Sequence, residues 1–220
     1  MAIKPQFQWA SSFSDGLACV MLRSRFGFID KTGKIVITPR FTSPGAFAEG
    51  LASVRIGGKA SNPASEMVIG PLGGRYAYID KSGKTVIDLG DQVENAEVFS
   101  EGLAAVEITG HRGFINRTGK LVIEPKFGGQ PRFCEGLAFV IIGGGGGIGF
   151  IDKDGVLVLQ SSFALAENFR DGLAVVYDSL DLPNARLGYI DQSAKLFGHP
   201  QNSRSGQKHK MTSSCPCPCC

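Results

Sequence analysis

The sequence predicts an all-β fold, a tandem repeat of five short three-stranded antiparallel units in an open, solenoid-like array. A closed, propeller-like arrangement is the alternative. Three observations lead to this prediction. One six-residue phrase recurs five times, a second phrase follows each copy, and 30 glycines in 220 residues supply turn positions. Self-similarity at a period of roughly 20 to 50 residues is typical of repeat architectures.

The first phrase predicts a turn followed by a short strand. It reads FSDGLA from Phe13, FAEGLA from Phe47, FSEGLA from Phe99, FCEGLA from Phe133 and FRDGLA from Phe169. The apolar residues after each glycine are too few for a helix, and the valines among them favour a strand. The acid of the phrase could be read as a ladder of cation ligands. Because it recurs in every unit, we interpret it instead as an acid–Gly turn residue. These acids are Asp15, Glu49, Glu101, Glu135 and Asp171.

The second phrase, GFIDKTGKIVI from Gly27 in the first unit, predicts two strands joined by a tight turn. A glycine with positive φ would close this turn, and it is supplied by Gly33, Gly83, Gly119 and Gly155. The fifth unit has Ala194 there, which costs about 1 kcal/mol or more in a left-handed conformation. An Asp or Asn ends the preceding strand. Because Asn replaces Asp once, we predict a turn-capping role for Asp30, Asp80, Asn116, Asp152 and Asp191.

The repeats define one folded region, residues 1–198, with units at about 5–38, 39–90, 91–124, 125–160 and 161–198. Residues 199–220 form a basic, Cys-rich tail without periodicity, which we expect to be disordered. Three of the 23 Lys and Arg residues lie in this tail, so residues 1–198 carry 20 basic and 20 acidic residues. A nucleic-acid partner is not expected, because no basic cluster marks the folded part.

The motif F-x-[DE]-G-L-A-x-V followed by G-[FY]-I-D-x-x-G-x-x-V-I resembles the WG (KWG) repeat of bacterial proteins over residues 5–198. The resemblance implies an all-β repeat and no particular activity. None of the five units keeps the Trp for which the repeat is named. The residues in its place are Phe26, Tyr76, Arg112, Ile148 and Leu187, of which only Arg112 is unusual as a packing residue.

Repetition without unique chemistry predicts a non-catalytic scaffold that binds a protein partner. We expect no enzyme activity, no cofactor and no metal site. The insertion from Gly57 to Gly74 is the most individual segment, and its apolar residues Met67, Val68 and Ile69 are the predicted partner contact.

A small-ligand or carbohydrate binder is the alternative function. It would use the aromatics Phe28, Tyr78, Phe114, Phe150 and Tyr189, one in each repeat. These alternate with Ile29 and its counterparts, so one of the two sets should face inward on a pleated strand. Burial of the aromatics would weaken the alternative, and exposure of three or more would favour it.

The location expected is cytoplasmic, since the N-terminus lacks a secretory signal pattern. No apolar run approaches the roughly 18 residues of a spanning helix. A membrane partner is expected only if the cysteine cluster at the end of the tail is lipidated. That cluster consists of Cys215, Cys217, Cys219 and Cys220.

Overall fold

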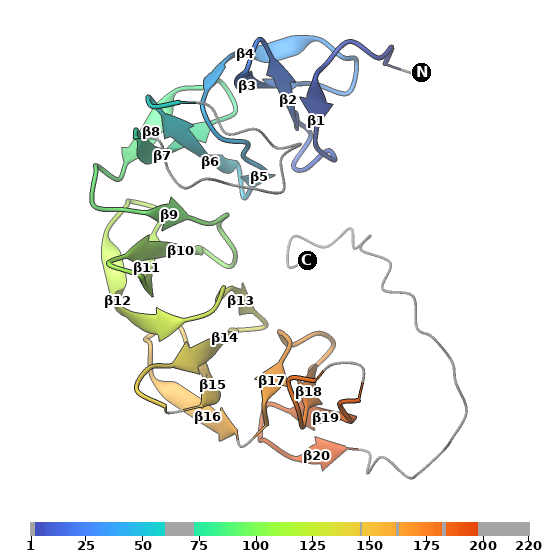
Figure 1. The fold of residues 1–220 in the computed structure, drawn as a ribbon, viewed down its shortest axis with the longest axis vertical. Helices are drawn as coiled ribbons and strands as arrows, with labels where there is room; N and C mark the ends of the chain where they lie inside the picture. The colour runs from blue at the N-terminus through green and yellow to red at the C-terminus, as the bar shows by residue number, and fades with distance from the viewer. Residues whose placement is uncertain (1–2, 60–72, 146, 162, 182–183, 198–220) are drawn as a thin grey trace. The chain divides into compact units, whose positions relative to one another are not determined.

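The computed structural model describes residues 3–59, 73–145, 147–161, 163–181 and 184–197. These residues contain strands and turns and no helix (Figure 1). The predicted all-β fold of antiparallel repeats is confirmed. The chain divides into two compact units, Met1–Pro125 and Lys126–Cys220, which are described separately below.

Unit 1 contains three repeat sheets in which consecutive strands pair antiparallel. Sheet 1 has β1 (Trp9–Ala10), β2 (Ala18–Leu22), β3 (Arg25–Ile29) and β4 (Ile35–Phe41). Sheet 2 has β5 (Phe47–Ala48), β6 (Leu51–Ile56), β7 (Arg75–Asp80) and β8 (Thr85–Asp88). Sheet 3 has β9 (Asn95–Ala96), β10 (Leu103–Ile108), β11 (His111–Asn116) and β12 (Leu121–Gly128), of which β12 continues into unit 2.

Unit 2 contains two repeat sheets with the same order. Sheet 4 has β13 (Phe133–Cys134), β14 (Leu137–Ile142), β15 (Ile148–Ile151) and β16 (Leu157–Ser161). Sheet 5 has β17 (Leu165–Ala166), β18 (Leu173–Tyr177), β19 (Leu187–Asp191) and β20 (Leu196–Phe197). The last residues of β12 pair with β14, Phe127 opposite Ile142 and Gly128 opposite Ile141.

Each repeat contributes four strands rather than the predicted three, and the additional strand is only two residues long. In the second repeat it is β5, where Ala48 pairs with Leu51 of β6 across Glu49–Gly50. Both turn residues have positive φ, 52° and 80°, as a two-residue type I′ hairpin requires. In the first, third and fifth repeats the short strand lies before the phrase, and an isolated bridge closes the acid–Gly turn, as between Ser14 and Leu17. The acid–Gly phrase is therefore a hairpin turn. The other four acids of the phrase have the same left-handed conformation, with φ between 52° and 54°.

The second hairpin has the predicted conformation. The φ of Gly33 is 87°, and that of Ala194 at the fifth turn is 62°, so an L-residue occupies the left-handed region there. Gly83, Gly119 and Gly155 have φ of 86°, 83° and 77°.

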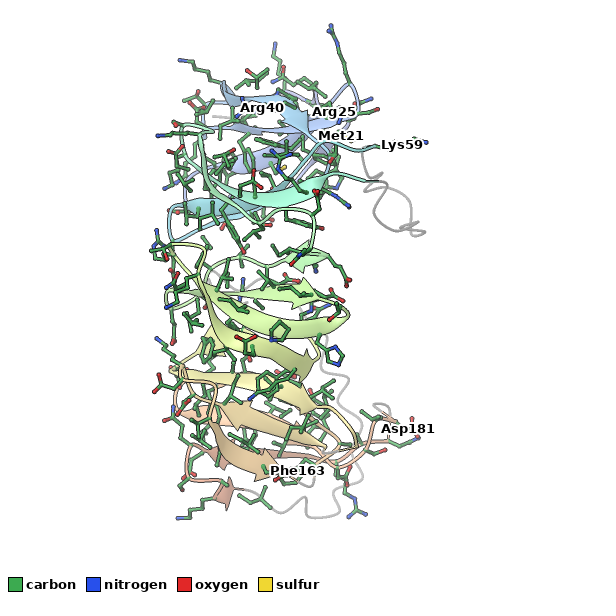
Figure 2. All side chains as sticks on the ribbon, turned by 90° about the vertical axis from the view of Figure 1, so that its left-hand side faces the viewer. Met21, Arg25, Arg40, Lys59, Phe163 and Asp181 are labelled. Carbon is green, nitrogen blue, oxygen red and sulfur yellow. The ribbon has the colours of Figure 1, made fainter. Side chains whose placement is uncertain are left out.

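The core lies between successive sheets. Between sheets 1 and 2, Phe26, Phe28 and Ile37 pack against Phe47 and Val54. Arg40 on β4, labelled in Figure 2, donates a hydrogen bond to the carbonyl of Gly83 across the same junction. Equivalent clusters fill the junctions between sheets 2 and 3 and between sheets 4 and 5.

Both sets of alternating residues on the middle strands of the first four repeats are buried, which corrects the expectation that only one set faces inward. Tyr78 and Ile79 are both 0% exposed. Tyr78 packs in the cluster with sheet 3, and Ile79 packs in the cluster with sheet 1. A sheet with a neighbour on each side has two buried faces, so period-two alternation no longer separates core from surface.

The glycine of the WG pair, Gly27 in the first repeat, is required because the backbone of the last strand passes close to it. A Cβ on Gly27 would lie 2.4 Å from the carbonyl oxygen of Ile37 and 2.6 Å from the nitrogen of Pro39. Gly113 has the same contacts with Ile123 and Pro125. The second repeat has Ala77 at this position, and there Leu89 stands in place of the proline.

Candidate functional site

The predicted partner contact, Met67, Val68 and Ile69, lies outside the described residues. The structure does describe where the insertion leaves and rejoins sheet 2. Ile56 pairs with Arg75, so β6 and β7 form a hairpin that ends at this point. A Cβ on Gly57 would lie 3.6 Å from the Cα of Gly74. The two ends of the insertion are therefore adjacent, and a short turn could replace it.

The carboxylates and the amide that end the second strand bind their own turns. Asp30 Oδ1 accepts hydrogen bonds from the backbone nitrogens of Thr32 (2.8 Å) and Lys34 (3.1 Å) and from the Thr32 hydroxyl (2.6 Å). The Thr32 hydroxyl is the main reason that the pKa of Asp30 is lowered. Asn116 Oδ1 accepts the same three bonds in the third repeat. Asp80, Asp152 and Asp191 also accept both backbone bonds.

The acids of the first phrase reach from one repeat to the next. Asp15 Oδ2 accepts a hydrogen bond from Gly50 N at 2.7 Å, and its Oδ1 lies 2.8 Å from Lys81 Nζ. Gly50 belongs to the acid–Gly turn of the following repeat, and Lys81 to its second hairpin. We call this arrangement the inter-repeat tie. The sequence predicts the turn, but not this longer-range contact.

The tie recurs at two further junctions. Glu49 accepts a hydrogen bond from Gly102 N at 3.2 Å and lies 3.2 Å from Arg117 Nη1. In unit 2, Glu135 Oε2 accepts a bond from Gly172 N at 2.9 Å. At this junction the fifth repeat has Gln192 where the second and third repeats have Lys81 and Arg117. Gln192 carries no charge to pair with the Glu135 carboxylate, and it donates a hydrogen bond to the Glu135 carbonyl instead.

The tie gives Asp15 a lowered pKa. The hydrogen bond from Lys81 is the largest cause, and the Gly50 amide contributes further. The ionised carboxylate is therefore the form that the junction stabilises. These acids act as structural groups, which agrees with the turn interpretation and extends it.

Arg112, the unusual residue at the Trp position, is nearly buried and paired. It is 9% exposed, and its guanidinium lies 2.9 Å from Glu107 and 3.4 Å from Glu97. In the second repeat, Tyr76 occupies this position with Arg55 over its ring, 5.4 Å from the centroid. The position is therefore a packing site between sheets in unit 1, and two carboxylates compensate for the charge of Arg112.

The aromatics proposed as a ligand platform are mostly core residues. Phe28, Tyr78, Phe114 and Phe150 are at most 1% exposed, whereas Tyr189 is 50% exposed. Burial is the main reason that the pKa of Tyr78 is raised. One exposed ring falls short of the three that would favour the carbohydrate-binding alternative.

An apolar position on the last strand of sheets 1 to 4 does face solvent. In unit 1, Val36, Val86 and Val122 occupy the same place in the second phrase and are 42% to 47% exposed. In unit 2, Val158 is 46% exposed. We call Val36, Val86 and Val122 the valine row. Single exposed apolar residues are ordinary, but an apolar side chain at the same exposed position of successive repeats is a feature of the repeat.

Other candidate chemistry is sparse in the part of the chain that the structure describes. No group of three or more His, Cys, Asp or Glu residues there is arranged to hold a metal ion. No described helix is long and apolar enough to cross a membrane. Cys19 and Cys134 are buried free thiols, and burial raises the pKa of Cys19 to about 11. His111 is exposed, with Nδ1 3.0 Å from the carbonyl of Thr109.

A protein-family model described as WG containing repeat matches residues 1–25, 26–59, 76–110, 113–145 and 148–177. Among curated proteins, none matches the chain.

Solved structures with a similar fold include β-propellers. The β-propeller domain of the Trilobed protease from Pyrococcus furiosus has a TM-score of 0.51 at 14% identity, with 87% of this chain and 68% of that chain covered. Hsv2 from Kluyveromyces lactis has a TM-score of 0.50 at 12% identity, with 84% of this chain covered. The chain spans 60% of the length of Hsv2. At these identities the likeness concerns the fold alone.

Proposed function

We propose that this chain, which belongs to the WG repeat family, is a non-catalytic scaffold that binds a protein partner through the outer strands of its sheets. The observation that carries the proposal is the valine row. A partner that lies along successive sheets would meet the same apolar side chain on each sheet of unit 1. Repeat proteins bind in this way, through many equivalent weak contacts on an extended surface.

Two further observations support a binding role over a chemical one. Asp15, Glu49 and Glu135 of the first phrase contact the following repeat, and the acids of the second phrase cap turns. Four of the five candidate aromatics are core residues. The side chains that could have formed a ligand site are thus used to build the repeats.

The test is affinity capture with three immobilised forms of the full chain. The first is the wild type, the second is V36T/V86T/V122T, and the third is the control K34Q/K84Q/K120Q. The control changes exposed residues two positions before each valine, on the same three repeats. Val→Thr keeps the shape and strand preference of the side chain and removes apolar surface.

The proposal expects a protein that the wild type and the lysine control retain and that the threonine variant loses. Identical captured proteins from all three forms would exclude the valine row as the binding surface. No protein enriched over a blank resin would contradict the scaffold proposal.

A fourth form tests the insertion predicted from the sequence. Deletion of residues 60–72 leaves Gly57, Gly58, Lys59, Gly73 and Gly74 as a five-residue loop between paired strands. A partner that is lost only from this form would place the contact in the insertion. Retention of every partner would remove Met67, Val68 and Ile69 from consideration.

A further inference from the structure

The first sheet leaves open a surface that the other repeats cover. Phe13 opens the first copy of the repeated phrase and is 43% exposed. The residues at the same position in the other four repeats are at most 2% exposed, and they are Phe47, Phe99, Phe133 and Phe169. Beside Phe13 lies a hollow of about 260 Å³, which Ile3, Phe7 and Ala18 help to line.

The last sheet leaves open the opposite face. Tyr189 is 50% exposed and Leu187 is 51% exposed. In sheet 1 the residues at these positions, Phe28 and Phe26, are at most 1% exposed. Leu173, on the neighbouring strand, is 38% exposed, whereas Leu17 is 8% exposed. An apolar face of this kind marks an interaction surface.

At the internal junctions these two positions contact each other. The ring centroids of Phe28 and Phe47 are 4.9 Å apart. Those of Tyr78 and Phe99 are 4.8 Å apart, and so are those of Phe150 and Phe169. In each pair the first ring belongs to the earlier repeat and the second to the later one. By its position in the repeat, Tyr189 corresponds to the first ring of such a pair, and Phe13 corresponds to the second.

The two open faces also carry complementary polar groups, an acid in sheet 5 and hydrogen-bond donors in sheet 1. Asp171 is the tie acid of the fifth repeat, and it is exposed without a hydrogen bond or ion pair in the described part of unit 2. Gly16 N and Lys31 are the tie donors of the first repeat, at the positions of Gly50 and Lys81. Both are exposed and have no such partner in the described part of unit 1.

The start of the chain reproduces a further part of the junction. A Cβ on Gly33 would lie 3.0 Å from Ile3 Cγ2, as a Cβ on Gly83 would lie 3.0 Å from Ile37 Cγ2. Residues 3–7 thus lie on sheet 1 as the end of β4 lies on sheet 2. In sheet 1, Phe41 at the end of β4 pairs with Phe26 of β3. Phe7, at the open face of sheet 1, corresponds to Phe41. Leu187, at the open face of sheet 5, corresponds to Phe26.

From this complementarity we propose that a second copy of the chain binds head to tail, with sheet 5 of one copy on sheet 1 of the other. Tyr189 packs against Phe13 beside the hollow. Asp171 accepts hydrogen bonds from Gly16 N and Lys31 Nζ. The contact reproduces the internal junction between molecules. Because its two sides are different surfaces, each dimer still carries one free face of each kind and can add further copies.

The test is the molar mass of the full chain as a function of concentration, by sedimentation equilibrium in the presence of a thiol reductant. The reductant removes any contribution from disulfides of the tail cysteines. The wild type is compared with D171K, K31E, the double variant D171K/K31E and the control D154K. Asp154 is an exposed residue of unit 2 outside the tie, so D154K makes the same charge change as D171K away from the proposed contact.

The proposal expects the mass of the wild type and of D154K to rise with concentration. Each single variant should associate about tenfold more weakly or worse, because it sets two like charges against each other. The double variant should recover association, since it restores an opposite pair with the signs exchanged. Both altered side chains are exposed and unpaired within their units, so circular dichroism spectra should match the wild type. The melting temperature of K31E should also match, whereas D171K places Lys in the left-handed region, at φ 52°, and should melt somewhat lower.

Three outcomes would overturn the proposal. The first is a monomeric wild type at all concentrations up to about 1 mM, a level at which even weak complexes form. The second is single variants that associate as the wild type does. The third is K31E with a lower melting temperature and the same mass as the wild type, which would place the contact of Lys31 within one molecule.

Discussion

Tyr78 and Tyr189 occupy the same position of the same phrase, AYID in the second repeat and GYID in the fifth. Tyr78 is 0% exposed, packs on Phe99 and donates a hydrogen bond to the carbonyl of Glu97. Tyr189 is 50% exposed. Local sequence therefore sets the strand and the direction of the side chain, and the following repeat sets its burial. Stability in such an array comes largely from the interfaces between neighbours.

The largest expected effect comes from removing the two rings. Tyr78→Ala should lower the free energy of unfolding by about 3–5 kcal/mol, as large-to-small changes of buried aromatics do. Tyr189→Ala should cost less than about 1 kcal/mol, because the ring is already half in water. Urea unfolding followed by circular dichroism measures both. Equal losses would show that the neighbouring repeat does not determine the contribution of the ring.

A second comparison concerns the glycine that approaches the last strand of its sheet. Gly27→Ala should cost about 1–3 kcal/mol, because the new Cβ must displace the backbone at Ile37 and Pro39. The reverse change, Ala77→Gly, should cost only about 0.5–1 kcal/mol, the usual effect of glycine in a strand. Thermal unfolding of the two variants shows which one loses more stability. A harmless Gly27→Ala would contradict the close approach.

The turn of the fifth repeat differs from the other four by one Cβ. Ala194→Gly should raise the free energy of unfolding by about 1 kcal/mol, since φ at this position is 62°. Gly33→Ala should act in the opposite direction by at least as much, because its Cβ would also lie 3.0 Å from Ile3 Cγ2. The urea midpoints of both variants measure these two changes in stability. A loss of stability in Ala194→Gly would contradict the strain expected at this turn.

The smallest effect is expected at the tie. Asp15→Asn should cost about 0.2–1 kcal/mol at pH 7, the range for partly exposed ion pairs. The pKa of Asp15 is lower in the folded state than its ordinary value of 3.8. Its contribution is therefore present above about pH 4 and disappears as the pH falls through the folded-state pKa.

The stability difference between the wild type and Asp15→Asn should accordingly shrink between pH 7 and pH 3. The matched control is Asp171→Asn, which changes the same position of the phrase where no tie is made within the unit. Measured at low protein concentration, it should change stability little at either pH. A pH-independent difference for Asp15→Asn would exclude the tie as its cause.

Much of the fold could be predicted because the residues that form its turns and strands recur from repeat to repeat. The turn glycines were predictable from the need for positive φ, and the capping role of Asp30 from its replacement by Asn116 in the third repeat. The acid–Gly hairpins were not predicted, although Asp-Gly is a strong hairpin signal. Three repeats have Glu in place of Asp, and Glu is not a usual residue for the left-handed region.

The long-range contacts of the site could not be predicted in the same way. The tie joins residues 35 and 66 positions apart, and it depends on how one sheet faces the next. A signal was present in the sequence, since Lys81 and Arg117 share one place in the second phrase. The pairing of Arg112 needs Glu97 and Glu107 of the third repeat. Glu97 recurs only as Glu167 in the fifth repeat, and Glu107 recurs in no other repeat.

The central claim is that neighbouring repeats stabilise each sheet, and amide hydrogen exchange on the full chain tests it most directly. At a concentration too low for association, the strands β6 and β7 of sheet 2 should be the slower to exchange, because sheets 1 and 3 cover both faces. The strands β18 and β19 of sheet 5 should exchange markedly faster, since one face carries exposed Leu187 and Tyr189. Equal protection of the two sheets would contradict the account.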